Sequence, residues 1–71
     1  MTKYQAADKA IATYDAFIFA DFGRPFDQEK ADLLAAVAVC ECEEASRDRS
    51  VNQATRDYYR EQAKIFRAIC A

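Results

Sequence analysis

Two cysteines and three glutamates lie close together near the middle of the chain, and they are the side chains whose types most suggest metal binding or redox chemistry. They are Cys40, Glu41, Cys42, Glu43 and Glu44. Thiolates bind soft metals such as zinc, and clustered carboxylates bind hard cations such as calcium. On a helix, however, residues two apart point about 200° apart, so the two thiols can neither chelate one ion nor form a disulfide with each other. We expect both to be buried as small apolar side chains.

The three glutamates also diverge on a helix, and the chain has no histidine, so the Glu-x-x-His pattern of helical di-iron sites is absent. They fall in the last turn of a predicted helix, where the negative helix dipole disfavours each carboxylate by about 0.3–1 kcal/mol. We expect Arg47 and Arg49, which follow directly, to pair with them; a carboxylate cation site is the alternative. We predict neither a metal nor a cofactor.

The residue types in the chain also argue against catalysis. Without histidine there is no common general base and no Ser–His or Cys–His pair, and a single glycine cannot form a phosphate-binding loop. We therefore predict that the protein is not an enzyme.

A basic stripe is the remaining chemical feature. Arg56, Arg60, Lys64 and Arg67 are spaced to share one side of a helix. Such a stripe is typical of a solvated surface, or of a helix that contacts phosphates. Because the net charge is −2, and phosphate contacts supply most non-specific affinity, nucleic-acid binding by a dimeric regulator is our alternative prediction rather than the main one.

The segment that must support these side chains is Ala31 to Cys42, in which ten of twelve residues are apolar. Read as a helix, it has a large face and a small face on opposite sides. The large face comprises Leu33, Leu34, Ala36, Val37 and Cys40, and the small face comprises Ala31, Ala35, Ala38, Cys42 and Ala45. Because small side chains permit close helix approach, we predict self-association, as a homodimer, through the small face.

Capping signals divide the chain into three helices. Thr2 with Gln5, Asp27, and Ser50 with Gln53 are predicted N-terminal caps, and Gly23 with Pro25 ends the first helix. We predict an all-α protein in which residues 1–71 form one small three-helix bundle, with helices near 3–22, 28–45 and 51–70 and the middle helix most buried.

Apolar periodicity predicts which side of each outer helix is buried. In the first helix the stripe is Tyr4, Ala7, Ile11, Tyr14 and Ile18, with Phe17 and Phe19 on its two flanks. In the third helix the predicted buried residues are Val51, Ala54, Tyr58, Ile65 and Ile69, opposite the basic stripe.

Length and composition restrict the class of protein. A chain of 71 residues has room for one small core, and three cysteines cannot form a closed set of disulfides. The N-terminal residues lack an apolar segment like that of a secretory signal, and no uncharged run could span a bilayer. We predict a cytoplasmic protein that does not bind membranes.

By elimination, the sequence favours a small acidic protein that acts by binding another protein. Inhibitors and adaptors made by phages and mobile elements are often of this kind, and they work by occupying a surface of a larger partner. The residues predicted to bind the partner are the exposed aromatic, arginine and acidic side chains of the outer helices. They are Asp8, Asp15, Phe19, Arg56, Arg60 and Arg67.

Overall fold

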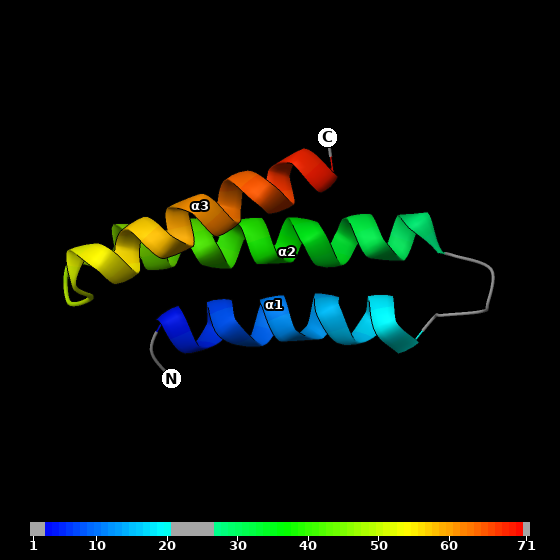
Figure 1. Cartoon of the computed structure of the whole chain (residues 1–71), viewed down its shortest axis with the longest axis horizontal. Coiled ribbons are helices and arrows are strands. Elements are labelled where there is room, and N and C mark those ends of the chain that lie inside the picture. Colours follow the sequence, from blue (N-terminus) through cyan, green and yellow to red (C-terminus); the bar gives the residue numbers. More distant parts are fainter. Residues whose placement is uncertain (1–2, 21–26, 71) are drawn as a thin grey trace.

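A computed structural model describes residues 3–20 and 27–70, which form three helices in sequence order. They are α1 (Lys3–Ala20), α2 (Gln28–Arg47) and α3 (Gln53–Ile69). Figure 1 shows that α1 and α3 run in the same direction and that α2 runs opposite to both. None of the described residues lies in a strand. The predicted all-α three-helix bundle is confirmed, whereas the predicted cap Thr2 and the predicted break at Gly23 and Pro25 lie outside the described residues.

Helix α2 begins where the sequence predicted, but α3 begins two residues later. The Asp27 side chain accepts a hydrogen bond of 3.1 Å from the backbone N–H of Lys30, as an N-cap does. At α3 the cap is Asn52, whose side chain accepts a bond of 2.8 Å from the N–H of Thr55. Ser50, the predicted cap, instead donates its N–H and its hydroxyl to the Asp48 carboxylate, at 2.9 and 2.6 Å.

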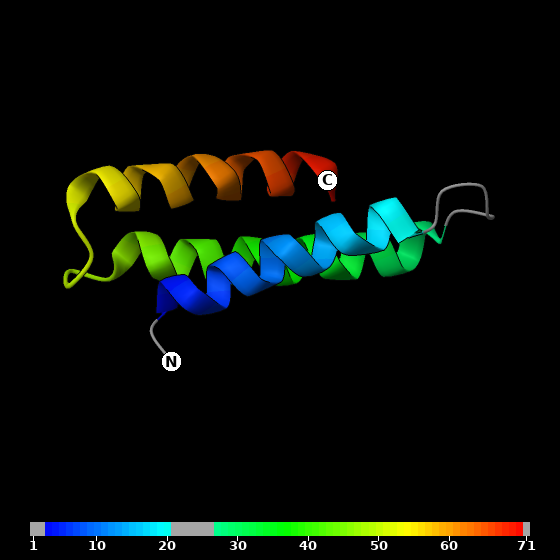
Figure 2. The same ribbon diagram turned by 60° about the horizontal axis from the view of Figure 1, so that its bottom comes forward.

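The small face of α2 is the most buried part of the molecule. Both α1 and α3 pack along α2. They lie on either side of it in Figure 1, and in Figure 2 α1 crosses in front of α2 while α3 lies above it. Each residue of the small face is at most 1% exposed; the five are Ala31, Ala35, Ala38, Cys42 and Ala45. Since α1 and α3 already cover this face within one chain, the surface that we predicted for self-association is not available to a second copy in this conformation.

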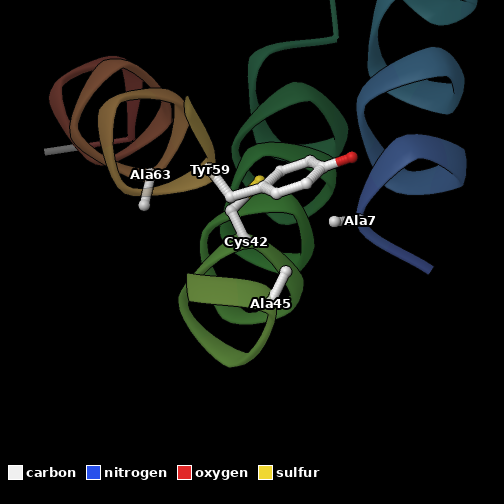
Figure 3. Close-up of a cluster of buried hydrophobic side chains, with 5 residues drawn as sticks. All are labelled: Ala7, Cys42, Ala45, Tyr59 and Ala63. Carbon is white, nitrogen blue, oxygen red and sulfur yellow. The ribbon is translucent and has the colours of Figure 1, made fainter. Parts of the chain in front are cut away.

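Alanine dominates the core. Among the described residues, seven of the ten buried apolar residues are alanines, so the helices approach closely but each contact removes little apolar area from water. One group of buried side chains, shown in Figure 3, combines Ala7, Cys42, Ala45, Tyr59 and Ala63. A second group combines Ala10, Ala35, Ala38 and Phe66, with Ile11, Tyr14, Val39 and Cys70 packed against it.

Helix α3 is rotated relative to the prediction. The residues expected inside, Tyr58, Ile65 and Ile69, are exposed, while Tyr59, Ala63 and Phe66 are buried. The prediction was therefore wrong about which side of α3 is buried.

Contacts with α1 explain the observed rotation. The Phe66 ring meets the Tyr14 ring edge-on, with centroids 5.2 Å apart, and the Tyr59 hydroxyl reaches a carboxylate of α1. The buried stripe of α1 is close to the predicted one, with Ala7 buried and Ile11, Tyr14 and Ile18 partly buried.

The helices differ from membrane-spanning segments. Over the part of the chain that the structure describes, no helix combines the length and the apolar character needed to cross a bilayer.

Candidate protein-binding surface

A group of tyrosines lies where α1 meets α3. The ring of Tyr59, on α3, lies 6.4 Å from that of Tyr4, on α1, and 5.0 Å from that of its neighbour Tyr58. Its hydroxyl donates a hydrogen bond of 2.5 Å to Oδ1 of Asp8, and Figure 3 shows the hydroxyl oxygen pointing toward α1. Burial, the hydrogen bond to Asp8 and the charge of Asp8 raise the pKa of Tyr59 far above its usual value, so the hydroxyl remains a donor.

An apolar surface extends along α3 from this junction. Tyr58, Ile65 and Ile69 follow one another at spacings of seven and four, and they are 50%, 52% and 38% exposed. We call these three residues the outer row of α3. A hollow of about 380 Å³ lies at the start of α3. It is lined by Tyr4 of α1 and by Ser50, Val51, Asn52 and Thr55.

The predicted partner-binding residues of α1 are all exposed. Asp8 belongs to the tyrosine junction, and Asp15 lies two turns further along the same flank of α1. Phe19 is 81% exposed. Phe17, in contrast, is partly buried, with the Lys30 ammonium 5.1 Å from its ring centroid. The aromatic residues that flank the α1 stripe therefore differ, since Phe17 packs within the fold and Phe19 faces solvent.

The basic stripe of α3 lies on the other flank of its buried side, and most of its cations have partners within the chain. Arg60 pairs with Asp57 at 3.4 Å and Lys64 with Glu61 at 3.2 Å. Arg67 pairs with Glu43 of α2. The structure thus connects the stripe to α2, and it does not bring these residues together with Asp8, Asp15 and Phe19.

Arg56 is the most enclosed member of the stripe. Its terminal nitrogen donates to Oε1 of Gln53 at 2.8 Å, but its Nε is buried without a hydrogen-bond partner. A buried unpaired donor is unfavourable. The Arg56 side chain is therefore held by its packing and by the bond from its terminal nitrogen to Gln53.

The two cysteines of α2 face opposite sides, as helical geometry requires. Cys42 is buried, and burial, followed by the charges of Asp8 and Glu41, raises its pKa to about 11. Cys40 is exposed, so the expectation that both thiols would be buried was wrong for Cys40. The reason is that it lies on the part of the large face that α1 and α3 leave exposed.

Glu43, in the glutamate cluster, pairs with two arginines. Glu43 accepts from Arg47 at 3.3 Å and pairs with Arg67. The pair with Arg47 follows the expected local compensation, and the contact with Arg67 was not expected. Among the described residues, no group of three or more histidine, cysteine or acidic side chains is arranged to hold a metal ion.

The outer row was missed because α3 carries two apolar stripes one residue apart. Tyr58, Ile65 and Ile69 have the same spacing as Tyr59, Phe66 and Cys70. Adjacent residues on a helix differ by about 100°, so only one stripe can face α2. The presence of two such stripes was the signal in the sequence that a large apolar surface of α3 would remain uncovered.

Comparison of the chain with protein-family models, with curated proteins and with solved structures gave no match.

Proposed function

We propose that this protein is a non-catalytic interaction module of the inhibitor or adaptor type, acting in the cytoplasm by occupying a surface of a larger protein. The observation that carries the proposal is the outer row of α3. Three large apolar side chains are exposed on one helix while alanines occupy most of the core. Folding of this chain alone does not account for that distribution, because exposed apolar area on a helix becomes favourable only when a partner covers it.

The shape and charge of the surface indicate the chemistry of the partner. Tyr58 and Ile69 are eleven positions apart, or about 16 Å along the helix, which matches roughly three turns of a partner helix. Exposed Asp8 and Asp15 lie on α1, and Asp8 adjoins the row through Tyr59. We infer that the partner presents an apolar ridge with lysine or arginine at its edge, since complementary charge guides association. Phe19 extends the contact at the end where α1 finishes.

The proposal is tested by recovering partners from a native lysate with the full chain as bait. Ile65→Glu places a charge in the outer row at an exposed position, so it is expected to abolish capture while leaving helicity and melting unchanged. Lys64→Glu changes the adjacent exposed residue on the other flank and serves as the matched control. Phe19→Ser and Asp15→Lys should each weaken capture, because both side chains are proposed to contact the partner. If the parent and Ile65→Glu chains recover the same proteins equally, this surface is not the binding site.

Two further predictions from the sequence concern other partners. A homodimer is part of the proposed function, but the small face of α2 that was predicted to form it is covered by α1 and α3. Nucleic-acid binding through the basic stripe stays a prediction, and no contact of the described residues favours it, because Arg60, Lys64 and Arg67 each pair with a carboxylate.

A further inference from the structure

Helix α3 carries two apolar rows that match each other position by position. The outer row is exposed, and a second row, which we call the inner row of α3, starts one residue later and packs toward α2 and α1. The inner row consists of Tyr59, Phe66 and Cys70, against Tyr58, Ile65 and Ile69 in the outer row. Because adjacent residues on a helix differ by about 100°, a rotation of α3 by about 100° about its own axis exchanges the two rows.

The surface of α2 that receives α3 does little to fix this rotation. Its buried side chains are Ala35, Ala38, Cys42 and Ala45. The rotation of a packed helix is normally fixed by large side chains that interdigitate with those of its neighbour. Four short side chains form only shallow grooves, so either row of α3 meets a similar apolar surface on α2.

A few side-chain contacts select the observed orientation. They join Tyr59 to Asp8, Phe66 to Tyr14 and Arg67 to Glu43. Asp8 and Arg67 are both exposed, and exposed pairs of this kind contribute little to stability. The observed orientation therefore depends on a small number of contacts near the edges of the interface.

Arg56 opposes the observed orientation. Its Nε is buried without a hydrogen-bond partner among the described residues, which is unfavourable. The basic stripe that contains Arg56 lies on the flank of α3 opposite to the outer row. A rotation that brings the outer row onto α2 therefore carries Arg56 away from α2, where water can hydrate this nitrogen.

We propose that α3 has a second packed orientation, rotated by about 100°, in which the outer row packs on α2 and the partner surface is withdrawn. The inference rests on the proposed function, since it describes the regulation of the same surface. Two packings of one sequence can lie close in free energy. A partner that binds the outer row binds only the observed orientation, so it shifts the population toward that orientation.

A cycle of two substitutions tests the second orientation without any partner. Ala63 is 3% exposed and Ile65 is 52% exposed, and the rotation exchanges their environments. Ala63→Lys therefore blocks only the observed orientation, and Ile65→Lys blocks only the rotated one. Each single variant should stay folded, and the double variant should unfold because a lysine is buried in either orientation.

Urea denaturation followed by circular dichroism measures the cycle. Ile65→Lys should lower the folded-to-unfolded ratio by about twofold at most in the parent chain, and roughly 100-fold or more in the Ala63→Lys background. Ala63→Gln with Ile65→Gln repeats the cycle with uncharged side chains, which are less unfavourable when buried. The proposal is overturned if the two substitutions act independently in both cycles, or if Ala63→Lys and Ala63→Gln each unfold the chain.

Thiol modification shows whether α3 has rotated or unfolded. In the Ala63→Lys chain, Cys70 should react with iodoacetamide faster than in the parent, and the thiol of an added Ile65→Cys substitution should react more slowly than in the parent background. Cys42 is buried on α2 in either orientation, so its modification reports unfolding. Faster modification at all three positions would mean that α3 has unfolded, and would contradict the rotation.

The rotation and the partner site are tested independently. If the cycle shows no second orientation while the parent captures a partner that Ile65→Glu loses, the outer row is a binding site that α3 does not withdraw. If the cycle shows the second orientation but the parent captures nothing, α3 rotates and the proposed function is wrong. A folded Ala63→Lys chain that captures the partner as well as the parent does would contradict withdrawal of the surface.

Discussion

At the scale of single residues, Tyr59 is the side chain that fixes the position of α3 against α1. Its ring is buried with alanines of both α1 and α3, and its hydroxyl is bonded to Asp8. A hydrogen bond to a charged group contributes about 1.5–3 kcal/mol when it is shielded from water. The bond from Tyr59 to Asp8 is partly shielded from water. The Tyr59 hydroxyl therefore contributes a noticeable share of the stability of a domain whose core is rich in alanine.

Tyr59→Phe is expected to lower the free energy of unfolding by about 1–2 kcal/mol, because it removes the donor to Asp8 and keeps the ring. Urea denaturation followed by circular dichroism measures the change. Tyr58→Phe is the matched control, since its ring is half exposed, and it should shift stability by less than about 0.5 kcal/mol. Equal effects of the two substitutions would contradict the role of the hydroxyl.

The three thiols should differ in reactivity in the folded protein. Cys40 is exposed, Cys70 is intermediate and Cys42 is buried, with the pKa of Cys42 raised to about 11. Because the thiolate is the reactive form, iodoacetamide at pH 8 should modify Cys40 first and Cys42 last. Peptide mass spectrometry gives the order. Modification of Cys42 at the rate of Cys40 without denaturant would contradict the burial.

Stability should decrease at alkaline pH. The raised pKa of Cys42 means that the folded state keeps the thiol protonated, so its contribution is complete below pH 9, the usual value, and is lost as pH rises toward 11. The raised pKa of Tyr59 acts in the same direction at higher pH. Melting temperatures measured at pH 7, 9 and 10 should therefore fall, and Cys42→Ala should reduce the fall between pH 9 and 10.

At the scale of elements, the start of α3 depends on whether Ser50 pairs with Gln53 or with Asp48. The sequence spacing of Ser50 and Gln53 suits a capping box, but Asp48 engages both the N–H and the hydroxyl of Ser50. The turn that this creates is closed by a bond from the N–H of Val51 to the carbonyl of Asp48. Asn52 is then the first residue able to cap the helix.

Asn52→Ala is expected to destabilise the protein by about 1 kcal/mol, the usual cost of losing an N-cap. Thermal unfolding at neutral pH measures the loss. Ser50→Ala is the control and should cost less than about 0.5 kcal/mol, since its contacts are exposed. The reverse order of the two effects would restore Ser50 as the cap.

At the scale of the whole molecule, charge is distributed unevenly but is largely compensated within the chain. The net charge is −2, and Arg60, Lys64 and Arg67 of α3 pair with carboxylates of α3 and α2. A phosphate backbone would have to displace these carboxylates and approach an acidic domain. Non-specific nucleic-acid affinity depends on the number of phosphates neutralised, so little affinity is expected.

We therefore expect no micromolar binding of a fluorescent DNA duplex or single strand at about 150 mM salt. Fluorescence anisotropy measures this, with a repeat at about 50 mM salt to reveal a weak electrostatic contact. Binding at physiological salt that is lost in Arg60→Glu, and not in Lys9→Glu on α1, would instead support the nucleic-acid alternative.

Local signals in the sequence determined the three helices, the cap at Asp27 and the buried side of α1. These features depend on the spacing of neighbouring residues. Because α1 has one apolar stripe, its periodicity indicates a single side that can be buried. The small face of α2 was also identified, although the sequence could not show whether another helix of the chain or a second copy would cover it. The exposure of Asp15 follows from its position off the apolar stripe, whereas the flanking position of Phe19 was compatible both with the edge of the core and with solvent.

Tertiary structure alone decided the rotation of α3 and, with it, the candidate binding surface. Two stripes of similar apolar character compete there, and the free-energy difference between burying one and burying the other comes from partners far away in sequence. Tyr59 with Asp8, Phe66 with Tyr14 and Arg67 with Glu43 all require the same rotation. Because no local pattern encodes these long-range pairs, the sequence named the apolar residues of α3 without showing which of them would remain exposed.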